Sequence, residues 1–409
     1  MVAFWVAYFV AFFLTAVYAG MMAFFIRGAL KVGRSRTTAA ESLQPSRAEL
    51  EIAVKAGVVA RGHVAEWQEV ADRNASDRLS FSVIVPLRNE EEHASATLQS
   101  LAQQDYMGDW EVICVDDRSE DRTAAIIKEF CDRDPRFSLV SIPLGLPAVP
   151  SPKKRALAAG FAAAKGEILL TTDADCIAPR GWIRSMSGRF TSDIGIVQGP
   201  KKIRGNGTLL SRYQEHEVFG LVSIEAATFA LGQPMIASAP SLAYRKELYQ
   251  SVGGFHGLED SVSGDDDLLV RKMQQQPKWK VAYNPSPDAC VTTSPVTGWI
   301  ALIQQRARWA SNGAHYDEKG FVALLVCVYA FYWWLALSPV FALLGWIPWA
   351  AFWAPAAVKI LLSGIFLSIT SRRLGHRGLL RDLIWCEILH VPIIIVAVIL
   401  GHLGLYRWK

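Results

Sequence analysis

Uncharged, apolar stretches lie at both ends of this chain, and the charged residues lie between them. The first 26 residues carry no charged side chain, and a helix needs roughly 20 apolar residues to cross the hydrocarbon core of a bilayer. This stretch lacks the basic leader and the shorter apolar region that are typical of a cleavable signal peptide. We therefore predict a retained transmembrane helix at residues 1–26.

A second apolar region begins near residue 320. Charged side chains are absent from 320 to 358, a length typical of two helices, and Gly345 and Pro348 favour a tight turn between them. A return helix that ends near Thr370 and a last span at about 383–405 complete the pattern. We therefore predict three transmembrane helices within residues 320–409.

Basic residues indicate which side of the membrane each segment faces. Arg27 and Lys31 follow the first helix at once, and the positive-inside rule places such residues in the cytosol. We expect an integral protein of the cell inner or plasma membrane whose middle part is cytosolic. With three C-terminal spans, Arg407 and Lys409 would fall outside, against the rule.

The cytosolic part is predicted to contain three pieces: a helical connector at 27–80, a region at 81–294 in which strands alternate with helices, and an amphipathic interface helix at 295–319. The alternation predicts an α/β fold with a mostly parallel, mixed sheet covered by helices. Ligands of such sheets bind beyond the carboxyl ends of the strands.

Composition excludes some classes of protein. The net charge is only +4 and the basic residues cluster near the membrane boundaries, which argues against nucleic-acid binding. The six cysteines contain no CxxC pair and no metal-ligand spacing, as expected for a reducing cytosol.

Polar residues end the first two strands of the α/β region. The first strand ends in Pro86, Asn89 and Glu90, and the second ends in Asp116 and Asp117. These groups can face a planar ligand, and the carboxylate of Asp117 can accept the imino proton of a pyrimidine base. The same residue types also suit loops and helix caps, so both interpretations stay open.

A later apolar strand ends in Asp173-Ala174-Asp175. Because side chains alternate along a strand, both carboxylates can point towards one diphosphate at the strand end. The negative charges of the carboxylates and the diphosphate repel one another unless a divalent cation lies between them. Hard oxygen ligands favour Mg²⁺ or Mn²⁺. We therefore predict that Asp173 and Asp175 hold such an ion.

Three consecutive acids, Asp265, Asp266 and Asp267, form another motif. Adjacent carboxylates repel one another unless they are hydrogen-bonded, paired or protonated, and a general base for a hydroxyl nucleophile needs a placed carboxylate. The alternative is a helix N-terminus, where acids complement the dipole. Both can hold, with Asp266 or Asp267 capping the helix and Asp265 facing the acceptor.

The stretch Gln305-Arg306-Ala307-Arg308-Trp309 lies on the predicted amphipathic helix. In one interpretation it is a membrane-surface helix whose arginines face lipid phosphates and whose Trp309 anchors it at the interface. In the other, Arg308 neutralises charge on a departing diphosphate and Trp309 closes the acceptor site.

Taken in order, these motifs resemble membrane-bound family-2 glycosyltransferases, a group that includes cellulose, chitin and hyaluronan synthases and ceramide glucosyltransferases. The matching stretches between about Phe81 and Asn312 are PLRNE, VDD, KKRALAAG, DADC, SGDDD and QRARW. The resemblance implies a GT-A fold, a UDP-sugar donor, a Mg²⁺ or Mn²⁺ ion and inversion at the anomeric carbon. Arg88 departs from the family, which usually has an aromatic residue before the asparagine.

The resemblance also implies roles for single residues. Asp265 is expected to be the catalytic base, with Asp266 as the runner-up, because the residues that follow fit the family's frame. Arg308 and Trp309 complete the expected catalytic set. The expected donor-binding residues are Pro86, Asn89, Glu90, Asp116, Asp117, Lys154, Asp173 and Gln305.

The acceptor is less clearly indicated. Four predicted spans are few for a channel that threads a polymer, and this arrangement is similar to that of enzymes that add one sugar to a membrane lipid. We expect hexosyl transfer to a lipid, which gives a glycolipid or lipid-linked sugar of the cell envelope. The alternatives are a processive polysaccharide synthase, with oligomerisation open, and a noncatalytic sugar-binding membrane protein, which would not need acids at all three sites. The apolar segment 218–244 suits a lipid entrance and a domain core equally well.

Three ionisable residues fall within the predicted C-terminal spans. An unpaired charge in a bilayer costs at least about 2.5 kcal/mol, and Lys359 and Glu387 are expected at similar depths on neighbouring helices. We predict a contact between them, with His390 as a further participant. The alternative is that the Lys359 side chain extends to the membrane surface.

Overall fold

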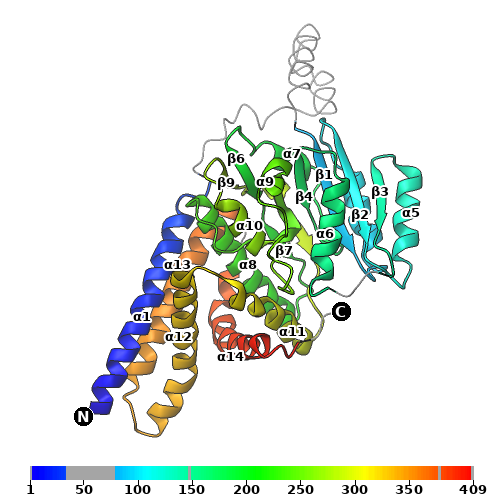
Figure 1. Ribbon diagram of the computed structural model, residues 1–409. Helices are drawn as coiled ribbons and strands as arrows, with labels where there is room; N and C mark the ends of the chain where they lie inside the picture. The colour runs from blue at the N-terminus through cyan, green and yellow to red at the C-terminus, as the bar shows by residue number, and fades with distance from the viewer. Residues whose placement is uncertain (1, 34–78, 146–148, 376–378, 407–409) are drawn as a thin grey trace, which may run out of the picture.

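The computed structural model describes residues 2–33, 79–145, 149–375 and 379–406. Most of the helical connector that we expect at 27–80 therefore lies outside the described residues. The described residues form an α/β domain joined to long apolar helices (Figure 1).

A mixed sheet with the strand order β3-β2-β1-β4-β8-β6-β9 forms the centre of the α/β domain. Its strands are β1 (Phe81–Leu87), β2 (Trp110–Asp116), β3 (Phe137–Ser141), β4 (Ile168–Thr171), β6 (Ile194–Gln198), β8 (Leu242–Arg245) and β9 (Lys280–Tyr283). β8 runs antiparallel to its neighbours β4 and β6, whereas the other paired strands run parallel. The prediction of a mostly parallel, mixed sheet is confirmed.

Helices cover both faces of this sheet. One face carries α4 (Ala94–Ala102), α5 (Thr123–Arg133) and α7 (Trp182–Ser187), and the other carries α6 (Pro152–Ala163), α9 (Lys246–Ser251) and α10 (Asp267–Gln274). Val83 and Val85 of β1 enter the first core, and Ile84 enters the second. All three side chains are buried, which explains why β1 is a continuous apolar run.

A smaller sheet with the order β5-β10-β7 lies beside the main one. Its strands are β5 (Cys176–Ile177), β7 (Lys201–Ile203) and β10 (Val291–Thr293). β5 follows directly after Asp175, so this sheet fixes the chain immediately beyond the Asp173-Ala174-Asp175 motif.

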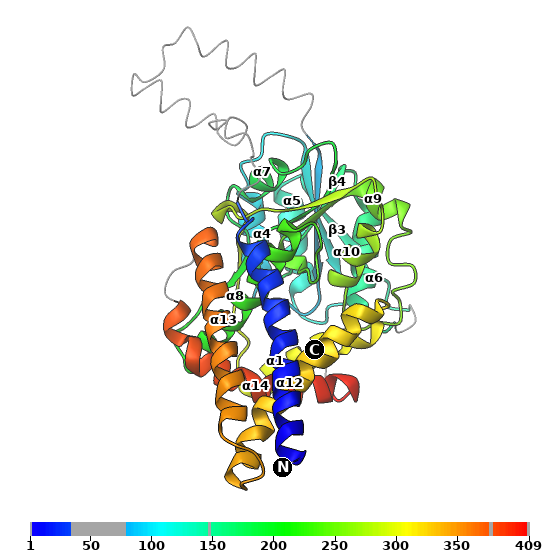
Figure 2. The same ribbon diagram turned by 90° about the vertical axis from the view of Figure 1, so that its left-hand side faces the viewer.

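Three apolar helices lie side by side in a bundle that projects from the α/β domain (Figures 1 and 2). They are α1 (Val2–Ala29), α12 (Lys319–Leu343) and α13 (Ala350–Leu374), and α8 (Leu209–Ala230) connects them to the sheet. The Ala227 backbone of α8 approaches α1 so closely that a Cβ on Gly28 would lie 2.3 Å from the Ala227 carbonyl oxygen. The Ser223 hydroxyl donates to the Thr370 hydroxyl of α13 at 2.9 Å. The bundle is therefore packed onto the domain.

A fourth apolar helix, α14 (Leu383–His402), completes the set. Among the described residues, α1, α12, α13 and α14 are the helices long and apolar enough to cross a membrane. The predicted set of one N-terminal and three C-terminal apolar helices is thus confirmed. However, α14 lies across the bundle of α1, α12 and α13 rather than along it (Figures 1 and 2).

The predicted contact between charges on α13 and α14 is also present. The ammonium of Lys359 forms an ion pair with the carboxylate of Glu387, and Lys359 is buried instead of extending to the membrane surface. Its ammonium lies 5.4 Å from the ring centre of Tyr332. His390 instead pairs with Tyr213, its Nδ1 lying 3.1 Å from the tyrosine hydroxyl.

Candidate active site

Residues from separate motifs meet at one edge of the main sheet. β1, β2 and β4 are neighbours and run parallel, so their carboxyl ends lie together. Pro86 lies near the end of β1, Asp117 follows β2, and Asp173 follows β4. This shared edge explains how residues far apart in the sequence reach one place.

Asn89 and Glu90 shape the loop that follows β1. The Asn89 N–H donates to the Ser119 hydroxyl at 3.1 Å, and the Asn89 side-chain carbonyl accepts from the Glu120 N–H at 2.8 Å. The Glu90 N–H donates to the Thr123 hydroxyl at 2.8 Å. These bonds join the loops after β1 and β2, while direct contacts of Asn89 and Glu90 with a donor stay predictions.

Asp117 is held by two arginines. Its Oδ1 lies 3.0 Å from Arg118 Nε and 2.9 Å from Arg155 Nη2. Arg155 belongs to α6, so this ion pair connects α6 to the end of β2. Asp116 is buried, and its Oδ1 accepts from the Ser119 N–H at 3.3 Å. A nucleotide base that contacted Asp117 would join or replace these ion pairs.

Asp173 and Asp175 form a candidate metal site with Cys176 beside them. One ligand atom of each residue lies within 4.8 Å of the others. The Cys176 thiol is buried and donates to Asp175 Oδ1 at 3.5 Å, and hard cations prefer oxygen ligands to sulfur. The half-buried carboxylates remain, and the Thr293 hydroxyl fixes one of them by donating to Asp175 Oδ2 at 3.0 Å. This oxygen donor set fits Mg²⁺ or Mn²⁺.

Lys153 links the metal motif to the acidic motif. Its ammonium lies 2.8 Å from Asp173 Oδ1 and 2.9 Å from Asp265 Oδ2. Burial opposes the charge on Lys153, but the carboxylates of Asp173 and Asp265 outweigh burial and raise its pKa. The ammonium therefore stays charged and holds the two carboxylates together.

Lys154, the lysine that we assigned to the donor, points elsewhere. Its ammonium donates to the carbonyl oxygens of Leu258 and Ser261, at 2.7 and 2.8 Å, and also to the Ser261 hydroxyl. These bonds occupy its three N–H groups. Lys154 therefore supports the loop before Asp265, whereas Lys153 faces the carboxylates. The donor role that we expected of Lys154 stays a prediction, and Lys153 is the better placed of the two lysines.

The three consecutive acids have different environments. Burial opposes ionisation of Asp265, but the Lys153 ammonium and the Arg308 guanidinium lower its pKa. Burial and the neighbouring carboxylates raise the pKa of Asp266 to about 7. Burial also raises the pKa of Asp267. Asp265 is therefore the acid most readily ionised, which is the state that a general base needs.

Asp266 and Asp267 hold the surrounding backbone. Asp266 caps α10, because its Oδ1 accepts from the Asp267 N–H at 2.8 Å, and its Oδ2 accepts from the Ala239 N–H at 3.1 Å. Asp267 accepts from the Tyr316 hydroxyl at 2.5 Å and from the Asn312 side-chain amide at 3.4 Å. The helix cap thus falls on Asp266, and the carboxylate of Asp265 faces Lys153.

The two arginines of α11 (Trp299–Ala310) have different partners. Arg306 is buried and its Nη2 lies 2.5 Å from a carboxylate oxygen of Glu217 on α8. The Gln305 side chain accepts a hydrogen bond from Arg306. Arg308 instead reaches the acidic loop, where its Nη1 donates to the Ser263 hydroxyl at 3.2 Å. Arg306 holds two helices together, and Arg308 faces the site.

Trp309 lies against the α/β domain. Its ring centre is 4.3 Å from the Arg306 guanidinium and 5.7 Å from the Lys201 ammonium. Lys201 belongs to β7, so the ring faces the domain, which disfavours its interpretation as a lipid anchor.

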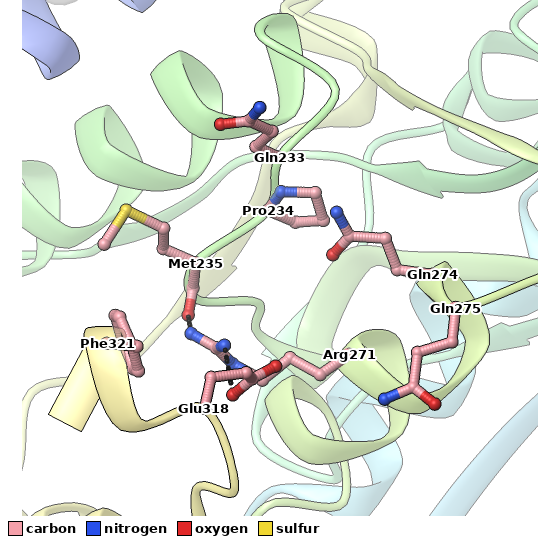
Figure 3. Close-up of a pocket in the computed structure, with 8 residues that line it drawn as sticks. All are labelled: Gln233, Pro234, Met235, Arg271, Gln274, Gln275, Glu318 and Phe321. Atoms are coloured by element: carbon pink, nitrogen blue, oxygen red, sulfur yellow. Dashed lines mark hydrogen bonds and ion pairs between the residues drawn. The ribbon is translucent and has the colours of Figure 1, made fainter.

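A cavity borders α10 at the point where α12 begins (Figure 3). Its lining residues are Gln233, Pro234, Met235, Arg271, Gln274, Gln275, Glu318 and Phe321. Arg271 donates to the Met235 carbonyl oxygen at 2.7 Å and lies 3.2 Å from the Glu318 carboxylate. Its guanidinium is 4.0 Å from the ring centre of Phe321. Because α10 begins at Asp267, this helix connects the acidic motif to the cavity.

The apolar segment 218–244, for which we considered a domain core and a lipid entrance, contributes to both the core and the cavity. Phe219 and Phe229 are buried in the domain core. Met235 lines the cavity beside α12. Only residues 233–235 of this segment line the cavity, whereas its last residues form the buried strand β8.

Four residues at the site were not identified from the sequence: Lys153, Arg155, Glu217 and Tyr316. Lys153 and Arg155 belong to the KKRALAAG stretch, whose resemblance to the family was a usable signal. Glu217 and Tyr316 had none, because their roles come from pairing with Arg306 and Asp267.

Comparison with known families adds to this geometry. Residues 82–253 match the family described as Glycosyl transferase family 2, and residues 168–400 match Glycosyl transferase family group 2. The second match covers more than half of the chain. The chain belongs to glycosyl transferase family 2.

Named relatives of this family 2 chain act on different molecules. An N-acetylglucosaminyltransferase of Rhizobium meliloti is 28% identical over 244 residues, which are 57% of this chain and 55% of the relative. The beta-monoglucosyldiacylglycerol synthase of Synechocystis is 30% identical over 234 residues, which are 56% of this chain and 47% of the relative. The chain spans about half the length of these curated relatives.

A solved structure shares the fold of this family 2 chain over nearly its full length. It is a mannosyltransferase from Pyrobaculum calidifontis in complex with GDP-Man and Mn²⁺. The likeness covers 97% of this chain and 98% of the other, with a TM-score of 0.57 and 19% identity. The α/β domain and the apolar helices therefore form one GT-A-like architecture.

Proposed function

We propose that this family 2 protein is an inverting glycosyltransferase that moves a sugar from a nucleotide-diphosphate donor to a membrane lipid on the cytosolic face. One observation carries the proposal: Lys153 contacts both Asp173 and Asp265. The carboxylate expected at the donor diphosphate and the carboxylate expected to act as base thus lie within reach of one ammonium. That arrangement suits a reaction in which a bound donor meets an acceptor hydroxyl.

The proposed reaction is a single displacement. The acceptor hydroxyl oxygen attacks the anomeric carbon while the bond between that carbon and the diphosphate oxygen breaks, which inverts the carbon. Asp265 takes the hydroxyl proton, and the nucleoside diphosphate leaves with the electron pair. Arg308 and Lys153 stabilise the negative charge that develops on the leaving group.

Asp173 and Asp175 would hold the divalent cation in this proposal. A bound Mg²⁺ or Mn²⁺ would supply positive charge to the diphosphate. The Mn²⁺ in the mannosyltransferase complex supports this choice. Uridine is our expected donor nucleoside, and the GDP-Man of that complex makes guanosine the alternative to test.

Two observations support a lipid acceptor. The cavity beside α10 opens where the apolar helix α12 begins, so an acceptor that left the membrane there would approach the acidic motif. One relative is named for the synthesis of a monoglucosylated diacylglycerol. We therefore propose a glycolipid or lipid-linked sugar as the product.

Purified protein in nanodiscs made with mixed membrane lipids provides the test. Each reaction contains one donor, UDP-glucose, UDP-N-acetylglucosamine or GDP-mannose, with Mg²⁺ or Mn²⁺, and the lipids are analysed by mass spectrometry. We expect one lipid class to gain a single hexosyl or N-acetylhexosaminyl mass with a uridine donor. EDTA and Asp175→Asn should each abolish this gain, whereas Asp193→Asn, the same change at an exposed surface carboxylate, should not.

Other outcomes identify what fails. Products whose mass grows with time would replace single transfer with processive synthesis. Full activity in EDTA or in Asp175→Asn would contradict the metal site. Donor binding without any transfer to lipid would contradict the lipid acceptor.

A further inference from the structure

The outward face of α14 is a continuous apolar stripe. Its exposed apolar residues recur every three or four positions and are Ile384, Ile388, Pro392, Val396 and Ile399, with Leu403 directly after the helix. His402, in the last turn, is exposed and polar. Ile384 and Leu403, near the two ends, are 62% and 64% exposed. A contiguous exposed apolar face of this kind marks a surface that contacts lipid or protein.

Both ends of α14 are attached to helices of the catalytic part. Before its first residue, Asp382 forms an ion pair with Arg212 of α8. After its last turn, the Tyr406 hydroxyl donates to the Ser311 hydroxyl at 3.2 Å, directly beyond α11. Near this end, a Cβ on Gly401 would lie 2.4 Å from the carbonyl oxygen of Ala307 in α11. The helix is thus packed closely against α11 and tied at each end.

These attachments are incompatible with a span. A helix that crosses a bilayer carries its ends to opposite sides of a hydrocarbon core about 30 Å thick. Leu383–His402 contains 20 residues, so α14 is about 30 Å long. α8 packs on the sheet, and α11 carries Arg308 into the acidic loop, so both helices lie on the catalytic side.

We propose that α14 lies in the plane of the membrane surface, on the side of the catalytic domain, with its apolar stripe in the lipid. The views of the molecule agree, because α14 crosses the bundle of α1, α12 and α13 at a steep angle (Figures 1 and 2). It is joined to that bundle by the Lys359–Glu387 ion pair and by a hydrogen bond at 3.1 Å from the Tyr329 hydroxyl to the Ile395 carbonyl oxygen.

The apolar stripe of α14 contacts the lipid monolayer on the side of the catalytic domain. The adjoining bundle also exposes large apolar side chains, such as Trp5 and Phe12 at 74% and 73%, so the two surfaces can meet one bilayer. An in-plane α14 would hold α11, and therefore Arg308, close to the membrane surface. It does not depend on the identity of the acceptor.

Cysteine labelling tests on which side α14 ends. Single cysteines are placed at Leu405, which is exposed beyond α14, at Lys128 on the catalytic domain, and at Trp346 between α12 and α13. Cys131 and Cys327, the partly exposed native cysteines among the described residues, are replaced by serine and alanine. In sealed vesicles we expect a membrane-impermeant maleimide to label Leu405→Cys from the same side as Lys128→Cys. Labelling of Leu405→Cys only from the opposite side would overturn the proposal.

Depth measurements give a second test that does not require activity. Spin labels at Ile384→Cys and Leu403→Cys are compared for their accessibility to oxygen in the bilayer and to a water-soluble nickel complex. An in-plane helix places both labels at similar depth, whereas a span would separate them by about 28 Å for 19 residues. Similar depths with strong oxygen accessibility support the proposal. Depths on opposite sides of the bilayer, or labels shielded from lipid by a second protein copy, would overturn it.

Discussion

The Lys153 ammonium lies 2.9 Å from the Asp265 carboxylate. Lys153 lies in the first turn of α6, and Asp265 lies just before α10, so the pair joins two separate parts of the domain. The contact lowers the pKa of Asp265 despite its burial, with Arg308 adding to the effect. It also keeps the expected base close to the Asp173 carboxylate.

Replacing Lys153 by methionine removes this charge and keeps most of the side-chain stem. The pKa of Asp265 should rise, so the acidic limb of the pH–rate profile should move to higher pH, and turnover should fall by about 10²-fold or more. Lys154→Met is the matched control. It should lower the melting temperature, because three hydrogen bonds to the 258–261 loop are lost, and leave the pH profile in place. An unchanged profile in Lys153→Met would show that Lys153 does not tune Asp265.

Asp265→Asn should retain donor binding and lose roughly two to four orders of magnitude in turnover, the usual scale of general-base catalysis. Asp266→Asn should affect turnover less, because Asp266 caps α10 and contacts Ala239. Titration calorimetry with the donor and single-turnover transfer separate the two effects. If the larger loss of turnover at unchanged donor affinity occurs in Asp266→Asn, the base is Asp266.

Local patterns predicted the strands, the apolar helices and the acidic motifs, because burial and periodicity act within a few residues. Which strand of the mixed sheet runs antiparallel was not predicted, since the pairing of β8 with β4 and β6 depends on long-range topology. The sequence also could not distinguish the environments of Lys153 and Lys154, for a physical reason. Adjacent residues at a helix start point in different directions, and only the partners, Asp173 or the 258–261 loop, distinguish them.

The orientation of α14 also could not be predicted from local sequence patterns. Its length and hydropathy are those of a span, and composition alone contains no information about the attachments at its ends. By contrast, the Lys359–Glu387 contact was predictable, because few partners can compensate for a charge among apolar residues.

Arg306 and Arg308 provide a matched pair of variants on one helix. Arg308→Ala should slow turnover by about 10²-fold with little change in thermal stability, because diphosphate charge develops mainly in the transition state. Arg306→Ala leaves Glu217 buried without its partner, which typically costs about 3–5 kcal/mol in stability. Melting curves and transfer rates of both variants check this division. A stability loss confined to Arg308→Ala would contradict it.

The raised pKa of Asp266 predicts a pH dependence of stability. Its value of about 7 in the folded protein exceeds the ordinary aspartate value near 3.9, which returns on unfolding. Between these two values the folded protein binds more protons at Asp266 than the unfolded chain, so this contribution to stability falls as pH rises. Thermal melting from about pH 5 to 7.5 should show a smaller decline for Asp266→Asn than for the unchanged protein. Parallel declines would mean that Asp266 is already ionised throughout this range.

The Lys359–Glu387 ion pair predicts non-additive mutations. Lys359→Met should destabilise the helix bundle strongly, because Glu387 loses the partner of a buried ion pair, which typically costs about 3–5 kcal/mol. The double variant with Glu387→Gln removes both charges and should recover part of that loss. Unfolding of the single and double variants in mixed micelles measures the coupling. Losses that simply add would show that the two charges do not stabilise each other, and the packing of α14 against α13 would then rest on the surrounding apolar contacts.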